Sequence, residues 1–207
     1  MTTASADENL SLDERKAALR KANSAIRARA AKAMPDSPAR LARHADALKA
    51  SLLPAEGLIV AGYWPIRSEI DPIPLLAALA GRGCRTALPA TPEPGKPLVF
   101  HHWQPGDPLV GGLYGTSEPQ ADAPRCQPDC LLVPMLAFDD GFFRLGYGGG
   151  FYDRSLAAIR VDKPTVRAVG IAYDDQKVAA VPVGPHDARL DAVLTPSGVI
   201  LPTGDNT

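Results

Sequence analysis

Four short apolar segments constrain the fold of this chain more than any other feature of its sequence. They read GLIVAGYW, CLLVPM, VRAVGIAY and AVLT, and they occupy residues 57–64, 130–135, 166–173 and 192–195. An uninterrupted apolar run of this length predicts a strand that is buried on both faces, because a half-exposed strand alternates apolar and polar residues. Segments with helical character separate the runs. The order predicts an α/β fold, in which helices cover both faces of a mainly parallel sheet.

Helices are predicted from capping residues, prolines and glycines. Ser11 and Glu14 form a capping-box pattern at the start of a first helix that ends near residue 34. Further helices are expected from Ser37, as cap, to Pro54, from Asp71 to Gly81, and onward from Gly149 or Gly150.

Loops at the carboxyl ends of the predicted strands are the expected ligand-binding region. The loops after residues 64 and 135 both leave such ends, so we expect them to face one cleft. Shorter strands are predicted at residues 84–89 and 98–103, the second of them at an edge. Residues 104–129 are dense in proline and glycine and lack periodicity. This segment is predicted to be a long surface connection, and one that could cover a site.

Composition and charge narrow the classes of function. A chain of 207 residues suits one domain with a proper core, predicted here as residues 11–203 after a flexible tail of residues 1–10. The formal net charge of -1 gives no sign of a nucleic-acid or membrane partner. No apolar run approaches the ~18 residues of a membrane span, and three cysteines make no disulfide framework. We therefore predict a cytoplasmic protein, and we expect it to be a monomer.

The segment RLGYGGGFYDR, residues 144–154, places four glycines among five consecutive residues. A strand, a glycine loop and a helix in this order favour phosphate binding, because backbone N–H groups and the positive end of the helix dipole can face the anion. The segment completes neither a Walker A motif nor G-x-G-x-x-G, since no Gly-Lys-Ser/Thr follows and position 151 is Phe. A tight turn that leads into a helix would also explain the glycines.

Charged residues near this loop have two interpretations each. Asp153 in the first helical turn either balances the dipole or, beside phosphates, binds magnesium. Asp187 is a candidate second carboxylate, and Arg144 is suited to a phosphate oxygen. Lys16 and Arg20 are four residues apart and share a helix face, which by itself indicates a solvated basic surface.

The motif VPMLAFDDGFFRLGYGGGFYDR at residues 133–154 resembles the signature of the 5-formyltetrahydrofolate cyclo-ligase family, also called 5,10-methenyltetrahydrofolate synthetases. Three further segments resemble the same family: KAALR at 16–20, YWPIRSEID at 63–71 and HDARLDAVLTPSGVI at 186–200. The resemblance implies a single three-layer α/β/α domain of the NagB/RpiA/CoA-transferase-like kind. It also implies ATP- and magnesium-dependent closure of 5-formyltetrahydrofolate to the 5,10-methenyl form.

The resemblance further implies roles for individual residues. The implied ATP contacts are Lys16, Arg20, Arg144, Leu145, Gly146, Tyr147, Gly148, Gly149, Gly150, Phe151 and Tyr152. The implied folate contacts are Trp64, Glu69 and Tyr152, the implied magnesium ligands are Asp153 and Asp187, and the expected catalytic residues are Arg144, Tyr152 and Asp153. Glu69 is expected to accept hydrogen bonds from the pterin, although a solvated loop glutamate is the alternative. Tyr152 is expected to line the site and Phe151 to belong to the core.

One departure from the family pattern bears on the charge of the site. Some members have Arg-Gly-Lys where this chain has Tyr147-Gly148-Gly149, so Lys16, Arg20, Arg144 or another basic residue must supply the positive charge. Two other functions stay open. One is a catalytically inactive folate- or nucleotide-binding module of the same fold, and the other is a small-molecule kinase that stops after phosphoryl transfer.

Overall fold

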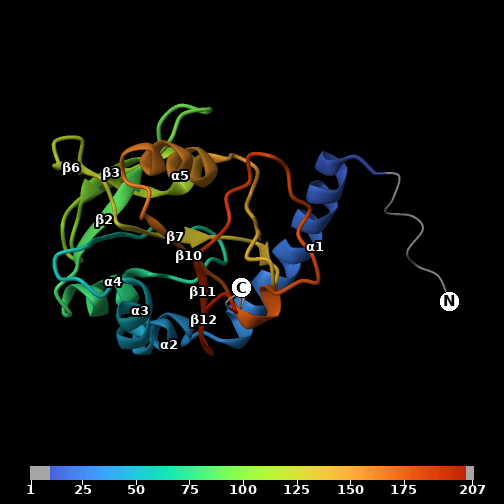
Figure 1. Cartoon of the computed structure of the whole chain (residues 1–207), viewed down its shortest axis with the longest axis horizontal. Helices are drawn as coiled ribbons and strands as arrows, with labels where there is room; N and C mark the ends of the chain where they lie inside the picture. The colour runs from blue at the N-terminus through green and yellow to red at the C-terminus, as the bar shows by residue number, and fades with distance from the viewer. Residues whose placement is uncertain (1–9, 204–207) are drawn as a thin grey trace.

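The computed structural model describes residues 10–203, so residues 1–9 of the predicted tail lie outside the described range. An eight-stranded sheet runs through the middle of the molecule (Figure 1). Its strands are β1 (Ile59–Ala61), β2 (Arg85–Ala90), β3 (Val99–His102), β6 (Arg125–Cys126), β7 (Cys130–Pro134), β10 (Arg167–Ile171), β11 (Ala192–Thr195) and β12 (Gly198–Ile200). The strand order is β12-β11-β10-β7-β1-β2-β3-β6.

The sheet is mainly parallel, as the apolar runs predict. The five strands from β11 to β2 pair in parallel, whereas β12, β3 and β6 join the two ends in antiparallel fashion. The predicted central position of β7 is confirmed, because it lies between β10 and β1 with Val60 and Arg167 both opposite Cys130. In β1, β7, β10 and β11, successive residues point to opposite faces of the sheet, and each face is covered by its own hydrophobic core. Both sets of residues are therefore apolar. On one face lie Val60, Leu132, Val169 and Leu194, and on the other Ala61, Leu131, Ala168 and Val193.

Helices cover both faces (Figure 1). On one face lie α2 (Ser37–Arg43), α3 (Ala45–Leu52) and α4 (Ile73–Ala80), and on the other lies α5 (Phe151–Asp162). Helix α1 (Leu12–Ala33) stands beside the sheet, where Ala30 joins the first core and Leu19 packs against a small cluster around Leu145. The α/β/α architecture is therefore the one expected from the sequence.

Helix boundaries follow the predicted capping chemistry in two places and depart from it in a third. The capping box of α1 is confirmed, with Ser11 and Glu14 exchanging hydrogen bonds of 3.3 and 2.9 Å. Asp71 Oδ1 accepts the N–H of Ile73 at 2.9 Å and so fixes the start of α4. The single helix predicted from residue 37 to 53 is wrong, because α2 and α3 are separated at His44.

The break at His44 coincides with one local contact and one distant contact. Its amide hydrogen bonds the carbonyl of Leu41, three residues back, and its ring lies 3.2 Å from the carbonyl oxygen of Pro196. The residue that caps α2 is Asp36 rather than Ser37, whose hydroxyl instead contacts that of Tyr173 at 3.3 Å. Ser37 is thereby used for packing against a distant strand end.

The connection at residues 104–129 contains more structure than the sequence predicts. It holds a hairpin of β4 (Leu109–Gly111) and β5 (Ser117–Pro119), joined by the short 3-10 turn η2 (Leu113–Gly115), and it ends in β6. Since β6 pairs with β3, the predicted edge position of β3 is wrong. Strands of two or three residues are too short to produce a periodic pattern.

The loops after β1 and β7 diverge to opposite faces of the sheet. The chain leaves β1 toward α4 on the first face and leaves the neighbouring β7 toward α5 on the second. In α/β sheets such a divergence opens a crevice beyond the carboxyl ends of the strands, where ligands bind. The topology alone therefore directs attention to this end of the sheet.

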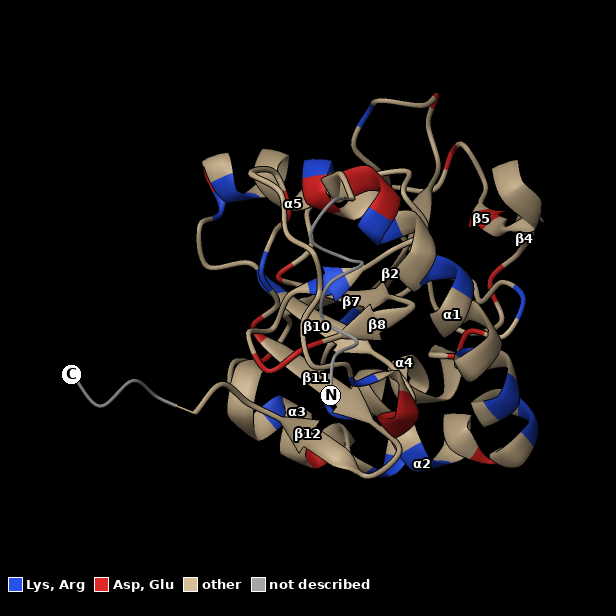
Figure 2. Cartoon of the chain, turned by 90° about the vertical axis from the view of Figure 1, so that its right-hand side faces the viewer, with Lys and Arg blue, Asp and Glu red and all other residues tan. Residues whose placement is uncertain are grey.

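Two surface properties bear on the partners expected from the sequence. In the view of Figure 2, basic and acidic segments are interspersed across the molecule rather than separated by sign. None of the helices in residues 10–203 combines the length and hydrophobicity that a membrane span requires.

Candidate active site

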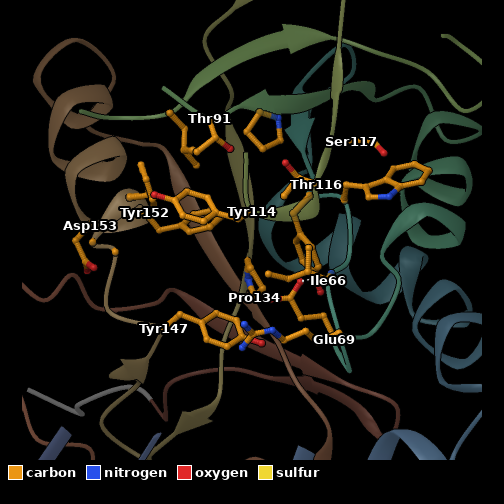
Figure 3. Close-up of a pocket in the computed structure, with 18 residues that line it drawn as sticks. Ile66, Glu69, Thr91, Tyr114, Thr116, Ser117, Pro134, Tyr147, Tyr152 and Asp153 are labelled. Carbon is orange, nitrogen blue, oxygen red and sulfur yellow. Dashed lines mark hydrogen bonds between the residues drawn. The ribbon is translucent and has the colours of Figure 1, made fainter. Parts of the chain in front are cut away.

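A cavity of about 490 Å³ lies beyond the carboxyl ends of β1, β2 and β7. Its walls come from the loops after these strands, from the β4–β5 hairpin and from the start of α5 (Figure 3). Lining residues include Trp64, Arg67, Glu69, Thr91, Tyr114, Tyr147, Gly149, Gly150, Phe151, Tyr152 and Asp153. The expectation that the two loops face one cleft is confirmed, and Tyr114, Thr116 and Ser117 of the 104–129 segment also line it.

The glycine loop has the backbone shape of an anion cradle. Gly148 and Gly150 have φ angles of +103° and +65°, which side chains disfavour, and Gly150 is the residue that caps α5. No side chain within residues 10–203 caps this helix, and residues 150–153 line the cavity, so the positive end of the helix dipole lies at the cavity wall. A Cβ at Gly148 would lie 3.3 Å from the Arg20 guanidinium.

A small hairpin places Arg144 at the base of this loop. It consists of β8 (Ala137–Phe138) and β9 (Arg144–Leu145), and its turn is held by Asp139. The two carboxylate oxygens of Asp139 accept the amides of Phe143 at 3.0 Å and Val181 at 2.8 Å. The conformation of this turn is thus fixed by a residue of its own FDDG segment, residues 138–141.

Arg144 and Asp153 form a partly buried ion pair behind the glycine loop. The guanidinium donates to Asp153 Oδ1 at 2.8 Å and to the carbonyl of Ala188 at 2.6 Å, and only 5% of its side chain is exposed. Asp153 Oδ1 also accepts the amide of Ala188 at 2.9 Å. The pair therefore links the start of α5 to the loop before β11.

Lys16 and Arg20 reach the same region from α1. Lys16 Nζ lies 2.5 Å from Asp187 Oδ2, which also accepts the amide of Gly184 at 2.6 Å. Burial alone would raise the pKa of Asp187, but these hydrogen bonds hold it below its usual value. Arg20 donates from Nε to the carbonyl of Gly146 at 3.0 Å. The basic face of α1 is thus in contact with the predicted nucleotide loop and the predicted metal residues, rather than with solvent alone.

Glu69 lies on the opposite side of the cavity from the β4–β5 hairpin (Figure 3), and 4% of its side chain is exposed. Burial raises the pKa of Glu69 to about 7, although the amide of Ile66 and the charge of Arg27 partly counter this effect. The Ile66 amide donates to Oε2 at 2.9 Å, and Arg27 NH1 lies 3.7 Å from Oε1. The solvated-loop interpretation of Glu69 is therefore wrong.

Sequence reasoning missed Arg27, which is 1% exposed and contacts the loop that bears Glu69. It donates to Ser68 Oγ at 3.1 Å, to the Met135 carbonyl at 3.3 Å and to the hydroxyl of Tyr147. The spacing of basic residues in the sequence could have identified Arg27, because it follows Arg20 by seven residues and so lies on the same helix face. That face also contains buried Asn23 and Ala30, which shows that α1 packs through a polar stripe.

The aromatic residues of the cavity differ from one expectation. Tyr152 lines the cavity as predicted, and burial raises the pKa of its phenol well above the usual value. Phe151 was expected in the core but is only half-buried and lies on the cavity wall, edge-on to Tyr114 with ring centroids 6.2 Å apart. Phe151 is the first residue of α5, and the residues of this first turn line the cavity. Trp64 is a half-buried lining residue.

The two predicted metal carboxylates are close in the fold but do not form a complete cage. Within residues 10–203 no group of three or more His, Cys, Asp or Glu side chains is arranged to hold a metal. Asp153 and Asp187 have four carboxylate oxygens between them. Of these four, only Oδ1 of Asp153 and Oδ2 of Asp187 accept hydrogen bonds from residues within 10–203. Each aspartate therefore keeps one oxygen for a further ligand, which suits a magnesium ion that takes most of its ligands from phosphate and water.

Comparisons with known proteins agree on one family. The model of the 5-formyltetrahydrofolate cyclo-ligase family matches residues 12–196. A cyclo-ligase of Escherichia coli strain K12 is 38% identical over 145 residues, which cover 68% of this chain and 79% of that protein. One from Mycolicibacterium smegmatis is 35% identical over 162 residues, which cover 73% and 81%. The NMR structure of Aquifex aeolicus 5,10-methenyltetrahydrofolate synthetase superposes with a TM-score of 0.71 at 25% identity and covers 93% of this chain and 95% of the other.

Proposed function

Because the chain belongs to the 5-formyltetrahydrofolate cyclo-ligase family, we propose that it converts 5-formyltetrahydrofolate to 5,10-methenyltetrahydrofolate, consumes ATP and releases ADP and phosphate. One observation carries this proposal. A single cavity joins the glycine loop to the loop that bears Glu69, so that a nucleotide and a folate can meet end to end. A cavity of about 490 Å³ suits the reacting parts of both molecules, since ligand pockets run from about 300 to 1,000 Å³.

The chemistry begins at the formyl oxygen. This oxygen attacks the γ-phosphorus of ATP, the bond from phosphorus to the bridging oxygen breaks, and ADP leaves. N10 of the folate then bonds to the activated formyl carbon and loses its proton. Finally the carbon–oxygen bond breaks, and phosphate departs with the former formyl oxygen. The methenyl bridge between N5 and N10 is the product.

On the nucleotide side, the proposal rests on the glycine loop and the basic residues behind it. The N–H groups at the start of α5 would contact phosphate oxygens, with Gly148 and Gly150 allowing the close approach. Lys16 and Arg20 would add positive charge from α1, and Arg144 would do so from β9. Charge stabilisation of this kind supplies most of the catalysis in phosphoryl transfer.

On the folate side, Glu69 would accept N–H groups of the pterin edge, with Trp64 and Tyr152 on the cavity wall. A carboxylate that is almost fully buried but lies against Arg27 is well suited to this role, because a ligand with two N–H donors would stabilise its ionised form. Tyr152 is common to both sides, at the first turn of α5.

Magnesium would be held by the free oxygens of Asp153 and Asp187 together with phosphate oxygens and water. When bound there, it would neutralise negative charge on the triphosphate and help to orient it. Arg144 and Lys16 already hold one oxygen of each aspartate in place, so both carboxylates are oriented before any ligand arrives.

The protein needs no covalent nucleophile for this reaction, only alignment and charge. Consistent with that need, none of the three cysteines lines the cavity within the described residues. Burial raises the pKa of Cys126 to about 11 and that of Cys130 further, so both thiols stay protonated near neutral pH.

The test is to incubate the purified protein with 5-formyltetrahydrofolate, ATP and magnesium and to follow the long-wavelength absorbance of the conjugated methenyl product. We expect one ADP for each methenyl group formed. Folate binding without any product would indicate an inactive binding module, and ATP consumption without ring closure would indicate a kinase.

A further inference from the structure

Three cationic side chains around the cavity already have an acidic partner. The pairs are Lys16 with Asp187, Arg27 with Glu69 and Arg144 with Asp153, at 2.5, 3.7 and 2.8 Å. Arg67 differs, because no carboxylate of residues 10–203 lies within 4.0 Å of its guanidinium even though the residue lines the cavity. Its charge is therefore available to an anion that enters.

Arg67 sits at the tip of a turn that is held in an unusual conformation. Its φ angle is +55°, and it is one of three non-glycine residues in the described chain with positive φ. The turn is fixed on both sides, since the Glu69 amide donates to the Ile66 carbonyl at 3.1 Å and the Ile66 amide donates back to Glu69 Oε2. Arg27 holds the next residue, Ser68, from below. Strained residues that their surroundings hold in place often have a functional role.

The side chain of Arg67 extends to the glycine loop. Its guanidinium carbon lies 5.4 Å from the ring centroid of Tyr147, and that of Arg27 lies 5.2 Å from the same centroid. The Tyr147 hydroxyl accepts a hydrogen bond from Arg27, so the ring is tied to helix α1. A guanidinium over an aromatic ring is held in place by a cation–π attraction, yet it keeps its N–H donors free. Arg67 thus joins the folate-side loop to the nucleotide loop.

We propose that Arg67 is a phosphate ligand, which contacts the terminal phosphoryl group of the nucleotide where that group meets the formyl oxygen. This inference rests on the proposed function. It assigns to Arg67 and Tyr147 together a part of the site that backbone N–H groups do not supply: a side-chain cation on the folate side of the transferred group.

The position of Arg67 favours the terminal phosphate over the other anion that the substrates carry, the carboxylates of the folate tail. Arg67 is two residues from Glu69, close enough for its charge to lower the pKa of that carboxyl. A pterin bound at Glu69 places the folate's reacting end, not its tail, next to Arg67. The part of ATP that approaches this end is the γ-phosphoryl group.

The experiment compares the wild type with Arg67→Asn, because asparagine accepts a left-handed backbone more easily than arginine does. Binding of a non-hydrolysable ATP analogue and of ADP would be measured by calorimetry with magnesium present. We expect the analogue to bind at least about tenfold more weakly to the variant, ADP to bind almost unchanged, and the unfolding temperature to stay the same or rise. Arg67→Lys should recover part of the affinity.

Tyr147 provides a second measurement that a purely structural role would not explain. Tyr147→Leu removes the ring, and Tyr147→Phe keeps it as the matched control. We expect the Leu variant, but not the Phe variant, to weaken binding of the ATP analogue, and its effect should be smaller when Arg67 is already Asn.

Three outcomes would overturn the inference. Equal losses for ADP and the ATP analogue would remove Arg67 from the terminal phosphate. Losses confined to folates, and growing with the number of glutamates, would assign Arg67 to the folate tail. Unchanged binding in an active enzyme would remove it from the site while leaving the proposed function intact. A wild type that forms no methenyl product would instead refute the proposed function, and this inference with it.

Discussion

Lys16 and Asp187 form an ion pair in which Nζ and Oδ2 are 2.5 Å apart, although 171 residues separate them in the chain. The pair joins α1 to the loop before β11 at the edge of the candidate active site. Resemblance assigns one residue to phosphate and the other to magnesium. In the ligand-free protein the two side chains are hydrogen bonded to each other. A nucleotide and its metal would therefore bind to side chains that are already oriented, rather than to side chains surrounded by water.

Asp187→Asn should destabilise the protein at neutral pH by on the order of 1–2 kcal/mol, because it replaces a charged hydrogen bond that is partly shielded from water. The folded-state pKa of Asp187 is lowered, so its stabilising effect is present above the unfolded pKa, near 4, and is lost as the pH falls below it. Urea unfolding at pH 7 and near pH 3 measures this. The difference in unfolding free energy between wild type and variant should shrink at low pH. A difference that stays constant would contradict the lowered pKa of Asp187.

Glu69→Gln should change the pH dependence of stability in the opposite sense. The pKa of Glu69 is raised to about 7, so its protonated form stabilises the fold below about 4.5, and this contribution is lost as the pH rises to about 7. Gln mimics the protonated form, so the variant should gain up to roughly 3 kcal/mol relative to wild type between pH 4.5 and 8. The measurement is the unfolding free energy of both proteins as a function of pH. If the two curves run parallel, the pKa of Glu69 is not raised in the folded state.

The same substitution tests the folate contact. In the wild type, 5-formyltetrahydrofolate should bind more tightly as the pH rises through about 7, because the pterin requires an ionised acceptor. Glu69→Gln should bind about tenfold or more weakly at pH 8 and show no such rise. Calorimetric titration from pH 6 to 8 distinguishes the cases, and a variant with the wild-type profile would exclude Glu69 as the acceptor.

Arg27→Met should cost about 3–5 kcal/mol in unfolding free energy, since it leaves buried Glu69 without its partner. Combining it with Glu69→Gln should restore more stability than Glu69→Gln adds to the wild type, because the neutral side chain no longer needs the partner. Arg29→Met is the matched control, because Arg29 lies exposed on the same helix. Chemical denaturation of the wild type, the three single variants and the double variant gives the answer. If the change in the double variant equals the sum of the changes in Arg27→Met and Glu69→Gln, the two residues do not interact.

Gly150→Ala should weaken ATP binding as well as stability. Its φ of +65° costs alanine about 1–2 kcal/mol, and the added Cβ would lie 2.6 Å from Arg154 NH1 at the helix start that faces the cavity. Gly57→Ala is the control, with a φ of +72° and nothing within 4 Å of the added Cβ. We expect similar destabilisation in both variants but a loss of nucleotide affinity in Gly150→Ala alone. Equal affinities would argue against the cradle.

The sequence predicts those parts of the fold that depend on local chemistry. The four apolar runs, the capping box of α1 and the glycines before α5 each have a pattern within a few residues, and each leads to the observed element. The two-residue strand β6 and the break at His44 depend on partners far along the chain, at β3 and Pro196. No local pattern encodes those contacts.

The candidate site divides in the same way. Tyr152, Asp153 and Glu69 stand in motifs that the resemblance recognises, and all three line the cavity. Arg27 lies outside the motifs, and Arg67 lies within the 63–71 motif but has no role assigned to it there. The importance of Arg27 lies in its burial and that of Arg67 in an uncommon backbone angle, which only the three-dimensional arrangement reveals. Phe151 was misassigned because an aromatic residue beside a strand is usually part of the core.

The most direct test of the whole account follows a single oxygen atom. The substrate 5-formyltetrahydrofolate would be prepared with ¹⁸O in the formyl group and turned over with unlabelled ATP, magnesium and water. If the site activates the formyl oxygen by phosphorylation, each phosphate released will carry one ¹⁸O. If the phosphate is unlabelled and the ¹⁸O appears in water, the formyl oxygen is not the group that the cavity brings to the nucleotide, and the account is wrong.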